Sequence, residues 1–139
     1  GQVVISGHAE AIDLACAKII EAGNKAVKLS VSAPFHCSLM DPVKPVMLEA
    51  LQNVTINTPK IPVISNVIAK SVTETKQIID CLVEQISGMV RWRESMLHLQ
   101  GLEVLNLTEV GAGKILSGIN KRIDRSFALK NIQSINDIA

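Results

Sequence analysis

The sequence predicts an α/β fold with mostly parallel strands, and three observations point to this class. Short apolar runs typical of buried strands alternate along the chain with longer segments whose apolar residues recur at helical spacing. Of the 139 residues, 47% are hydrophobic and 19% are charged, a balance typical of one compact globular unit. The sequence contains no internal repeat or low-complexity stretch, which agrees with one ordered domain rather than a repeat array.

The first 31 residues predict a strand, a helix and a second strand. Residues 2–5 form an apolar run suited to a buried strand, and residues 25–31 alternate between polar and apolar side chains, as a half-exposed strand does. An amphipathic helix lies between them and ends at Gly23 and Asn24. Its apolar face consists of Ile12, Ala15, Cys16, Ile19 and Ile20.

The middle of the chain predicts two helices with a strand between them. The first helix covers residues 38–52 or 41–52, and its start is expected to be irregular because Pro45 removes one backbone hydrogen bond. Residues 61–64 predict the strand, and the helix after it has Thr73 as its expected N-cap. The apolar face of this second helix consists of Ile78, Ile79, Leu82, Val83 and Ile86.

The last third of the chain predicts a short helix, a strand, a glycine turn and a final helix. The short helix covers residues 91–101, the strand residues 104–107 and the turn residues 111–113. The pattern fades after the final helix, so no element is assigned from Phe127 onward. The side chains of the final helix that are expected to face inward are Ile115, Leu116, Ile119 and Ile123.

Charge and composition argue against nucleic acids and membranes as partners. Fourteen Lys and Arg residues against thirteen Asp and Glu residues leave a formal net charge of +1, and only 2% of the residues are aromatic. No apolar run is long enough to span a bilayer, and no secretory leader is recognisable. The sequence begins with Gly1 rather than Met, which suggests a piece of a longer protein. Three cysteines without metal-site spacing favour reduced thiols and a cytoplasmic location.

His36 is the strongest candidate for chemistry, because it lies in a turn between an expected strand and a helix N-terminus, where open α/β sheets build their sites. The positive end of the helix dipole disfavours a charged imidazole, so a neutral His36 could act as a general base. An ordinary loop histidine explains the position equally well. No nucleophile is evident, since Cys16 belongs to an apolar helix face and neither Cys37 nor Cys81 has a motif around it. A thiol hydrolase that uses Cys37 or Cys81 remains an alternative, although no sequence motif supports it.

The segment Gly111-Ala112-Gly113-Lys114 matches a phosphate-binding turn only in part. The dinucleotide pattern needs a third Gly where Leu116 stands, and the Walker pattern needs Ser or Thr where Ile115 stands. A structural turn is therefore favoured. No metal site is predicted, because the remaining histidines, His8 and His98, have no acidic or cysteine neighbours at the spacing of metal ligands.

Five segments of the sequence match the motifs of one enzyme family, in the family's order. They are residues 1–8 (GQVVISGH), 31–40 (VSAPFHCSLM), 64–67 (ISNV), 83–92 (VEQISGMVRW) and 109–116 (EVGAGKIL). The set closely resembles the motifs of the malonyl-CoA:acyl carrier protein transacylases of bacterial type II fatty-acid synthesis. Two departures are small, because Met89 and Ala112 stand where the family usually has Pro and neither change removes a reactive group.

The resemblance implies an acyltransferase that moves a malonyl group from coenzyme A to a serine and then to the phosphopantetheine thiol of acyl carrier protein, with no cofactor besides these substrates. It implies that His36 is the catalytic base and that the main-chain carbonyl of Gln85 holds the other N–H of the imidazole. It also assigns Phe35 and Asn66 to substrate binding. The alternative function is a non-catalytic module that binds an acidic carrier protein through Lys114, Lys121, Arg122 and Arg125.

The family's nucleophile motif, Gly-His-Ser-x-Gly, does not occur in the sequence, so the resemblance covers only a C-terminal portion. It implies that residues 1–31 are the second βαβ half of an inserted ferredoxin-like subdomain. It further implies that residues 32–139 are the C-terminal part of an α/β-hydrolase-like acyltransferase body. We therefore expect the isolated chain to be inactive without the N-terminal part of the enzyme, and to be marginally stable, oligomeric or rearranged.

Overall fold

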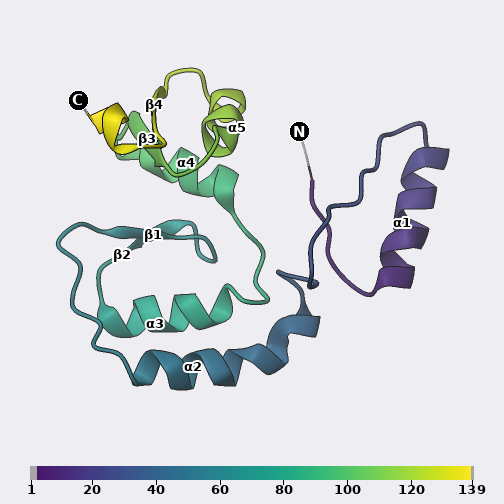
Figure 1. Cartoon of the computed structure of the whole chain (residues 1–139), viewed down its shortest axis with the longest axis horizontal. Coiled ribbons are helices and arrows are strands. Elements are labelled where there is room, and N and C mark those ends of the chain that lie inside the picture. The colour runs from purple at the N-terminus through teal and green to yellow at the C-terminus, as the bar shows by residue number, and fades with distance from the viewer. Residues whose placement is uncertain (1–2, 139) are drawn as a thin grey trace. The chain divides into compact units, whose positions relative to one another are not determined.

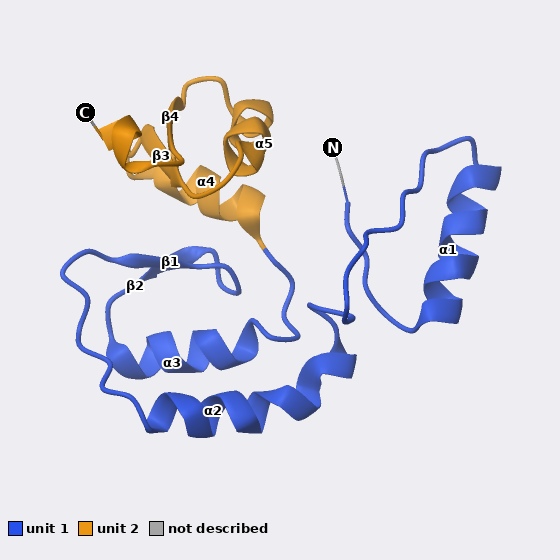
Figure 2. Ribbon diagram, viewed as in Figure 1, with its two compact units in different colours: residues 1–90 blue, residues 91–139 orange. Residues whose placement is uncertain are grey.

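The chain contains both helices and short strands, as the α/β class predicts, but they do not alternate regularly along it (Figure 1). The computed structural model describes residues 3–138, which form two compact units, Gly1–Val90 and Arg91–Ala139 (Figure 2). The prediction of one compact unit is therefore wrong. The buried apolar residues of the described chain are divided between the two units, with Ala69 and Val72 in the first and Met96 and Phe127 in the second.

The first helix, α1 (Ala9–Glu21), forms where the apolar spacing predicts it. Gly23 ends it with a φ of 78°, a backbone conformation that glycine adopts without strain, and donates its N–H to the Ile20 carbonyl oxygen at 2.9 Å. None of the residues of α1 is buried, and Ile20 on its apolar face is 60% exposed. The other members of the apolar face are half-buried, so the face is only partly covered in the structure.

The two strands predicted on either side of α1 do not form in the described residues. Residues 3–8 and 24–37 contain neither helix nor strand, and residue 2 lies outside the described range. A strand is stabilised by the backbone of a neighbouring strand, and neither segment pairs with one within residues 3–138. The second segment is tied to α1 instead, since Lys28 forms an ion pair with Asp13.

The rest of the first unit consists of a helix that starts as a 3-10 helix, a second helix beside it, and a two-stranded hairpin. The 3-10 helix η1 (Ser38–Val43) continues into α2 (Lys44–Gln52), so the predicted irregular start is confirmed. Helix α3 (Thr75–Glu84) lies beside α2 (Figure 1), and Glu74 rather than the predicted Thr73 occupies its N-cap position. Strands β1 (Val63–Ser65) and β2 (Lys70–Val72) pair antiparallel, which departs from the predicted mostly parallel arrangement.

The second unit contains a parallel βαβ arrangement. Helix α4 (Trp92–Gly101) precedes β3 (Asn106–Val110), and α5 (Ile115–Ile123) connects β3 to the parallel strand β4 (Ala128–Ile132). A 3-10 helix, η2 (Ile135–Ile138), follows. The prediction that Ile115 faces inward is wrong, because its side chain is 73% exposed in the first turn of α5.

The described helices include none that is both long and apolar enough to cross a membrane. The boundary between the compact units, after Val90, differs from the boundary expected after residue 31. That expected boundary refers to the subdomains of a longer enzyme, and it stays a prediction.

Candidate active site around His36

The imidazole of His36 faces two main-chain oxygens that are distant in sequence. Its Nδ1 atom lies 3.1 Å from the carbonyl oxygen of Gln85 and 3.0 Å from that of Gly88. The backbone N–H of His36 donates to the carbonyl oxygen of Ile86 at 3.3 Å. The contact with Gln85 is the one that the family resemblance implies. Because residues 85–88 supply all of these oxygens, we call them the carbonyl loop.

This geometry determines which ring nitrogen of His36 carries the proton. A carbonyl oxygen can only accept a hydrogen bond, so Nδ1 must donate to the oxygens of Gln85 and Gly88. In the neutral imidazole the lone pair therefore resides on Nε2. A histidine held in this way can accept a proton at Nε2 while Nδ1–H remains bonded to the protein, which is the arrangement a general base requires.

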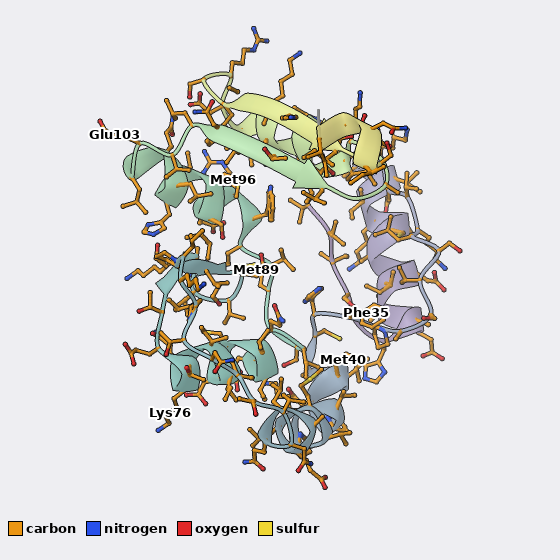
Figure 3. The ribbon with its side chains drawn as sticks, turned by 60° about the vertical axis from the view of Figure 1, so that its left-hand side comes forward. Phe35, Met40, Lys76, Met89, Met96 and Glu103 are labelled. Carbon is orange, nitrogen blue, oxygen red and sulfur yellow. The ribbon has the colours of Figure 1, made fainter. Side chains whose placement is uncertain are left out.

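The backbone of His36 adopts an uncommon conformation. Its φ is 63°, in the left-handed region where histidine is several-fold enriched among the non-glycine residues that occur there. The turn that contains it follows Pro34 and leads into η1, and Figure 3 labels Phe35, which precedes His36, and Met40, which lies in η1. The left-handed turn lets both the backbone N–H and the ring of the same residue contact the carbonyl loop.

The end of α3 explains why the carbonyl loop has oxygens to offer. α3 ends at Glu84, so the carbonyl groups of residues 85–88 lie beyond its backbone hydrogen-bond ladder and can accept from other groups. The loop then turns sharply, with the N–H of Gly88 donating to the Glu84 carbonyl oxygen at 2.9 Å. A Cβ atom at residue 88 would lie 2.8 Å from that oxygen, so only glycine fits without a shift.

Charged side chains join the carbonyl loop to the helices that follow His36. The hydroxyl of Ser87 donates to Asp41 Oδ1 at 2.7 Å, and Lys44 Nζ lies 3.2 Å from Asp41 Oδ1 and 2.9 Å from Glu84 Oε2. The Ser87 hydroxyl and, next, Lys44 lower the pKa of the Asp41 carboxyl. Hydrogen bonds to Glu84 and then Asp41 raise the pKa of the Lys44 ammonium group. Asp41 and Lys44 therefore favour their charged forms.

Of the two residues assigned to substrate binding, Phe35 is the sequence neighbour of His36 and Asn66 lies in the turn between β1 and β2. Phe35 immediately precedes His36, and its side chain is 46% exposed. Asn66 is half-buried in the turn between β1 and β2, and it is not among the hydrogen-bond partners of His36. The structure thus brings His36 and Gln85 together and leaves Asn66 outside this contact.

The cysteines are free thiols, all half-buried. The Cys37 thiol donates to the carbonyl oxygen of Pro34 at 3.2 Å, which engages the proton of the thiol nearest to His36 in sequence. Within residues 3–138, no group of three or more His, Cys, Asp or Glu side chains is placed to hold a metal ion.

The glycine turn of the second unit is occupied by the protein's own groups. The N–H of Gly111 donates to the Ile132 carbonyl oxygen at 2.9 Å, and that of Gly113 to Gln133 Oε1 at 3.0 Å. The Glu109 carboxylate accepts the N–H of Leu116 at 3.0 Å and that of Ser117 at 2.8 Å, at the start of α5. The position where a helix N-terminus would bind a phosphate therefore already holds a carboxylate, which supports the structural-turn interpretation.

Comparison with known proteins identifies the homologues of the chain. No protein-family model matches it. The malonyl CoA-acyl carrier protein transacylase of Haemophilus influenzae is 44% identical over 142 residues, a match that covers 100% of this chain and 44% of that protein. The chain is a homologue of the C-terminal part of these transacylases. The resemblance drawn from the five sequence motifs is therefore confirmed.

Solved structures of transacylases agree with this identification. The acyl-carrier-protein-S-malonyltransferase of Bartonella henselae has a TM-score of 0.89 at 35% identity, covering 95% of this chain and 42% of that one. A malonyl-transacylase in complex with its type II PKS acyl-carrier protein has a TM-score of 0.88 at 32% identity, covering 95% and 43%. The chain spans less than half the length of the transacylases it matches.

Three groups in the site, Asp41, Ser87 and Gly88, were not predicted from the sequence. Each acts on the site through a partner about forty to fifty positions away, as in the separation of 46 between Ser87 and Asp41. No local spacing pattern connects residues at such distances, and only the fold brings them together.

Proposed function

We propose that the chain supplies the catalytic histidine of an enzyme that transfers a malonyl group from coenzyme A to the phosphopantetheine thiol of acyl carrier protein in fatty-acid biosynthesis. The observation that carries this proposal is the imidazole of His36, with Nδ1 held by two carbonyl oxygens and the lone pair on Nε2. The transacylase homologues support it. In this proposal the transfer needs no cofactor besides malonyl-CoA and acyl carrier protein. The cytoplasmic location stays a prediction.

His36 Nε2 would act twice in one cycle. It takes the proton of a serine hydroxyl as that oxygen attacks the malonyl thioester, and it returns the proton to the departing coenzyme A thiol. It then takes the proton of the carrier's thiol, which attacks the malonyl ester, and returns it to the released serine oxygen. The Gln85 and Gly88 oxygens stabilise the imidazolium that forms in each half, because Nδ1–H still donates to them.

The serine nucleophile has to come from outside this chain. The sequence contains no Gly-x-Ser-x-Gly, and the homologous transacylases are more than twice as long as the chain's match to them. We therefore propose that the chain alone is inactive and that the N-terminal part of the enzyme is its partner. In the complete site we assign Phe35 and Asn66 to contacts with the malonyl substrate.

A chimera tests this proposal directly. The N-terminal remainder of the Haemophilus influenzae transacylase is joined to residues 1–139, and transfer from malonyl-CoA to acyl carrier protein is measured. We expect no transfer by the chain alone, transfer by the chimera, and a loss of about a thousandfold in His36→Ala, the contribution typical of a general base. His8→Ala is the matched control, since His8 is an exposed histidine of the same unit. Unchanged turnover in His36→Ala would reject the role of His36.

A second candidate function is a non-catalytic module that binds acyl carrier protein. Lys114, Lys121, Arg122 and Arg125 are exposed around α5, and they could attract an acidic carrier surface. Titration of carrier protein against the chain alone, at low and high salt, separates the two functions. Binding that weakens with salt supports the module, because exposed charges are screened. Absence of binding at low salt rejects it.

A further inference from the structure

We propose that Asp41 is a positioning residue for His36, because its carboxylate holds Ser87 and thereby the carbonyl loop that faces the imidazole. The proposal rests on the proposed function of His36 as a base. Asp41 lies in η1, five positions after His36 in sequence, so one short stretch of chain carries both the ring and the group that secures its partners.

Every residue from Glu84 to Gly88 is bound to a residue between His36 and Lys44. Gln85 and Gly88 offer their oxygens to the ring of His36, and Ile86 accepts the His36 backbone N–H. The remaining two residues are held by side chains, because Ser87 donates to Asp41 and Glu84 pairs with Lys44. Two side-chain contacts, Ser87 with Asp41 and Glu84 with Lys44, therefore hold the backbone on which the ring partners Gln85 and Gly88 lie.

Asp41 is the junction of the side-chain contacts. Its Oδ1 atom accepts the Ser87 hydroxyl at 2.7 Å and lies 3.2 Å from the Lys44 ammonium nitrogen, which itself reaches Glu84 at 2.9 Å. A hydrogen bond to an ionised acceptor is shorter and stronger than one between neutral groups. The lowered pKa of Asp41 agrees with a carboxylate that stays ionised.

Ser87 lies between the two residues whose oxygens matter most in this arrangement. Gln85 and Gly88 must both point their carbonyl groups toward Nδ1, which constrains the backbone between them. The hydrogen bond to Asp41 is the side-chain restraint at that point. Without it, we expect the loop to sample conformations in which fewer oxygens face the ring, so that the Nδ1–H tautomer loses its advantage.

Nuclear magnetic resonance of the chimera, labelled with ¹⁵N-histidine, tests this inference. Two-bond nitrogen–hydrogen spectra report the tautomer of each imidazole, and the His36→Gln variant identifies the His36 signal. We expect the ratio of Nδ1–H to Nε2–H to fall about fivefold in Asp41→Ala and in Ser87→Ala, the change that loss of one net hydrogen bond produces. Asp41→Asn keeps an oxygen acceptor for Ser87 and is expected to retain most of the wild-type ratio. Asp80→Ala, which removes an exposed acid of α3, is the matched control.

A tautomer ratio unchanged in both Asp41→Ala and Ser87→Ala would overturn the inference. If Asp41→Ala loses the dispersed amide spectrum of the folded chimera, Ser87→Ala decides alone, since it removes a single hydroxyl group. The measurement requires no malonyl transfer. An inactive chimera with the expected tautomer shifts would therefore reject the proposed function and leave the positioning of the ring by Asp41 intact.

Discussion

The ring of His36 and the main chain of Gly88 meet at 3.0 Å although 52 positions separate the two residues in sequence. The contact links the turn that follows Pro34 to the loop at the end of α3. Gly88 contributes a carbonyl oxygen and, because it has no side chain, also allows the loop to pass within 2.8 Å of the Glu84 oxygen at the place a Cβ would occupy. The ring orientation therefore depends on a residue that offers no side-chain chemistry.

Gly88→Ala is expected to reduce malonyl transfer by the chimera about a hundredfold, because displacing the carbonyl loop misplaces the base. Gly101→Ala is the control, since no other part of the described chain lies within 4 Å of the position a Cβ would take there. Transfer rates measured for both variants check the prediction. Equal rates for Gly88→Ala and wild type would show that the loop accommodates a methyl group beside the Glu84 oxygen without displacing the base.

Gln85→Ala is expected to change the transfer rate of the chimera by less than about threefold, because the contact with His36 uses the main-chain oxygen, which alanine retains. His36→Ala measured in the same assay gives the scale of a full loss. A large loss in Gln85→Ala would assign a role to the amide side chain and contradict the orienting function of the carbonyl group alone.

Glu109→Gln is expected to lower the denaturation midpoint of the chain near neutral pH. Hydrogen bonds from the Ser117 hydroxyl and backbone, and then from Leu116, lower the pKa of the Glu109 carboxyl in the folded state. A group with a lowered folded pKa contributes stability above its unfolded pKa, and this contribution is lost as the pH falls through the folded pKa. The difference between wild type and variant should therefore shrink in acid.

Urea denaturation of Glu109→Gln near pH 7 and near pH 3 measures this difference on both sides of the ordinary glutamate pKa of about 4.3. Glu103→Gln is the control, because Glu103 is an exposed acid in the same unit. A gap between wild type and Glu109→Gln that stays constant with pH would contradict the assigned role of the carboxylate.

Cys37→Ala is expected to keep the transfer rate of the chimera within about threefold of wild type, because its thiol bonds to the Pro34 oxygen and is not the proposed nucleophile. Cys81→Ala provides the comparison for the other candidate thiol. Loss of transfer in Cys37→Ala, together with inactivation of the wild type by a thiol alkylator, would instead favour thiol chemistry at this position.

The isolated chain is expected to self-associate, because the segments on either side of α1 expose unpaired apolar side chains. These are Val3, Val4, Ile5, Val27, Leu29 and Val31. Light scattering over a range of concentrations should give a mass above 15.0 kDa that falls toward that value on dilution. Val27→Lys should weaken the association, whereas a monomer with a cooperative, high-temperature unfolding transition would contradict it.

The helices were the most predictable part of the fold, since each one depends mainly on its own residues. The apolar spacing located α1, α3 and α5 to within a few residues. Strands depend on their neighbours, and this explains the errors. Residues 25–31 have a strand pattern but no partner in the described chain, whereas β2 and β4 form at unpredicted positions because β1 and β3 pair with them.

In the candidate site, too, some residues could be predicted from the sequence and others depend on the fold. His36 was recognisable from its place before a helix, and Gln85 from the family motif around it. Asp41 and Ser87 have no distinctive neighbours in sequence, and their 2.7 Å contact exists only once η1 and the end of α3 are side by side. Local patterns can therefore indicate the reactive side chain, but not the groups that orient it.

The partners of the imidazole are main-chain oxygens, and this affects how the site can be studied genetically. Point substitution replaces side chains and leaves peptide carbonyl groups in place, so an alanine scan would detect the histidine and pass over the two oxygens opposite Nδ1. Replacing the amide bond that contains the Gln85 carbonyl with an ester, by chemical ligation, would weaken that acceptor directly. Backbone chemistry, rather than side-chain mutagenesis, is the method suited to this half of the site.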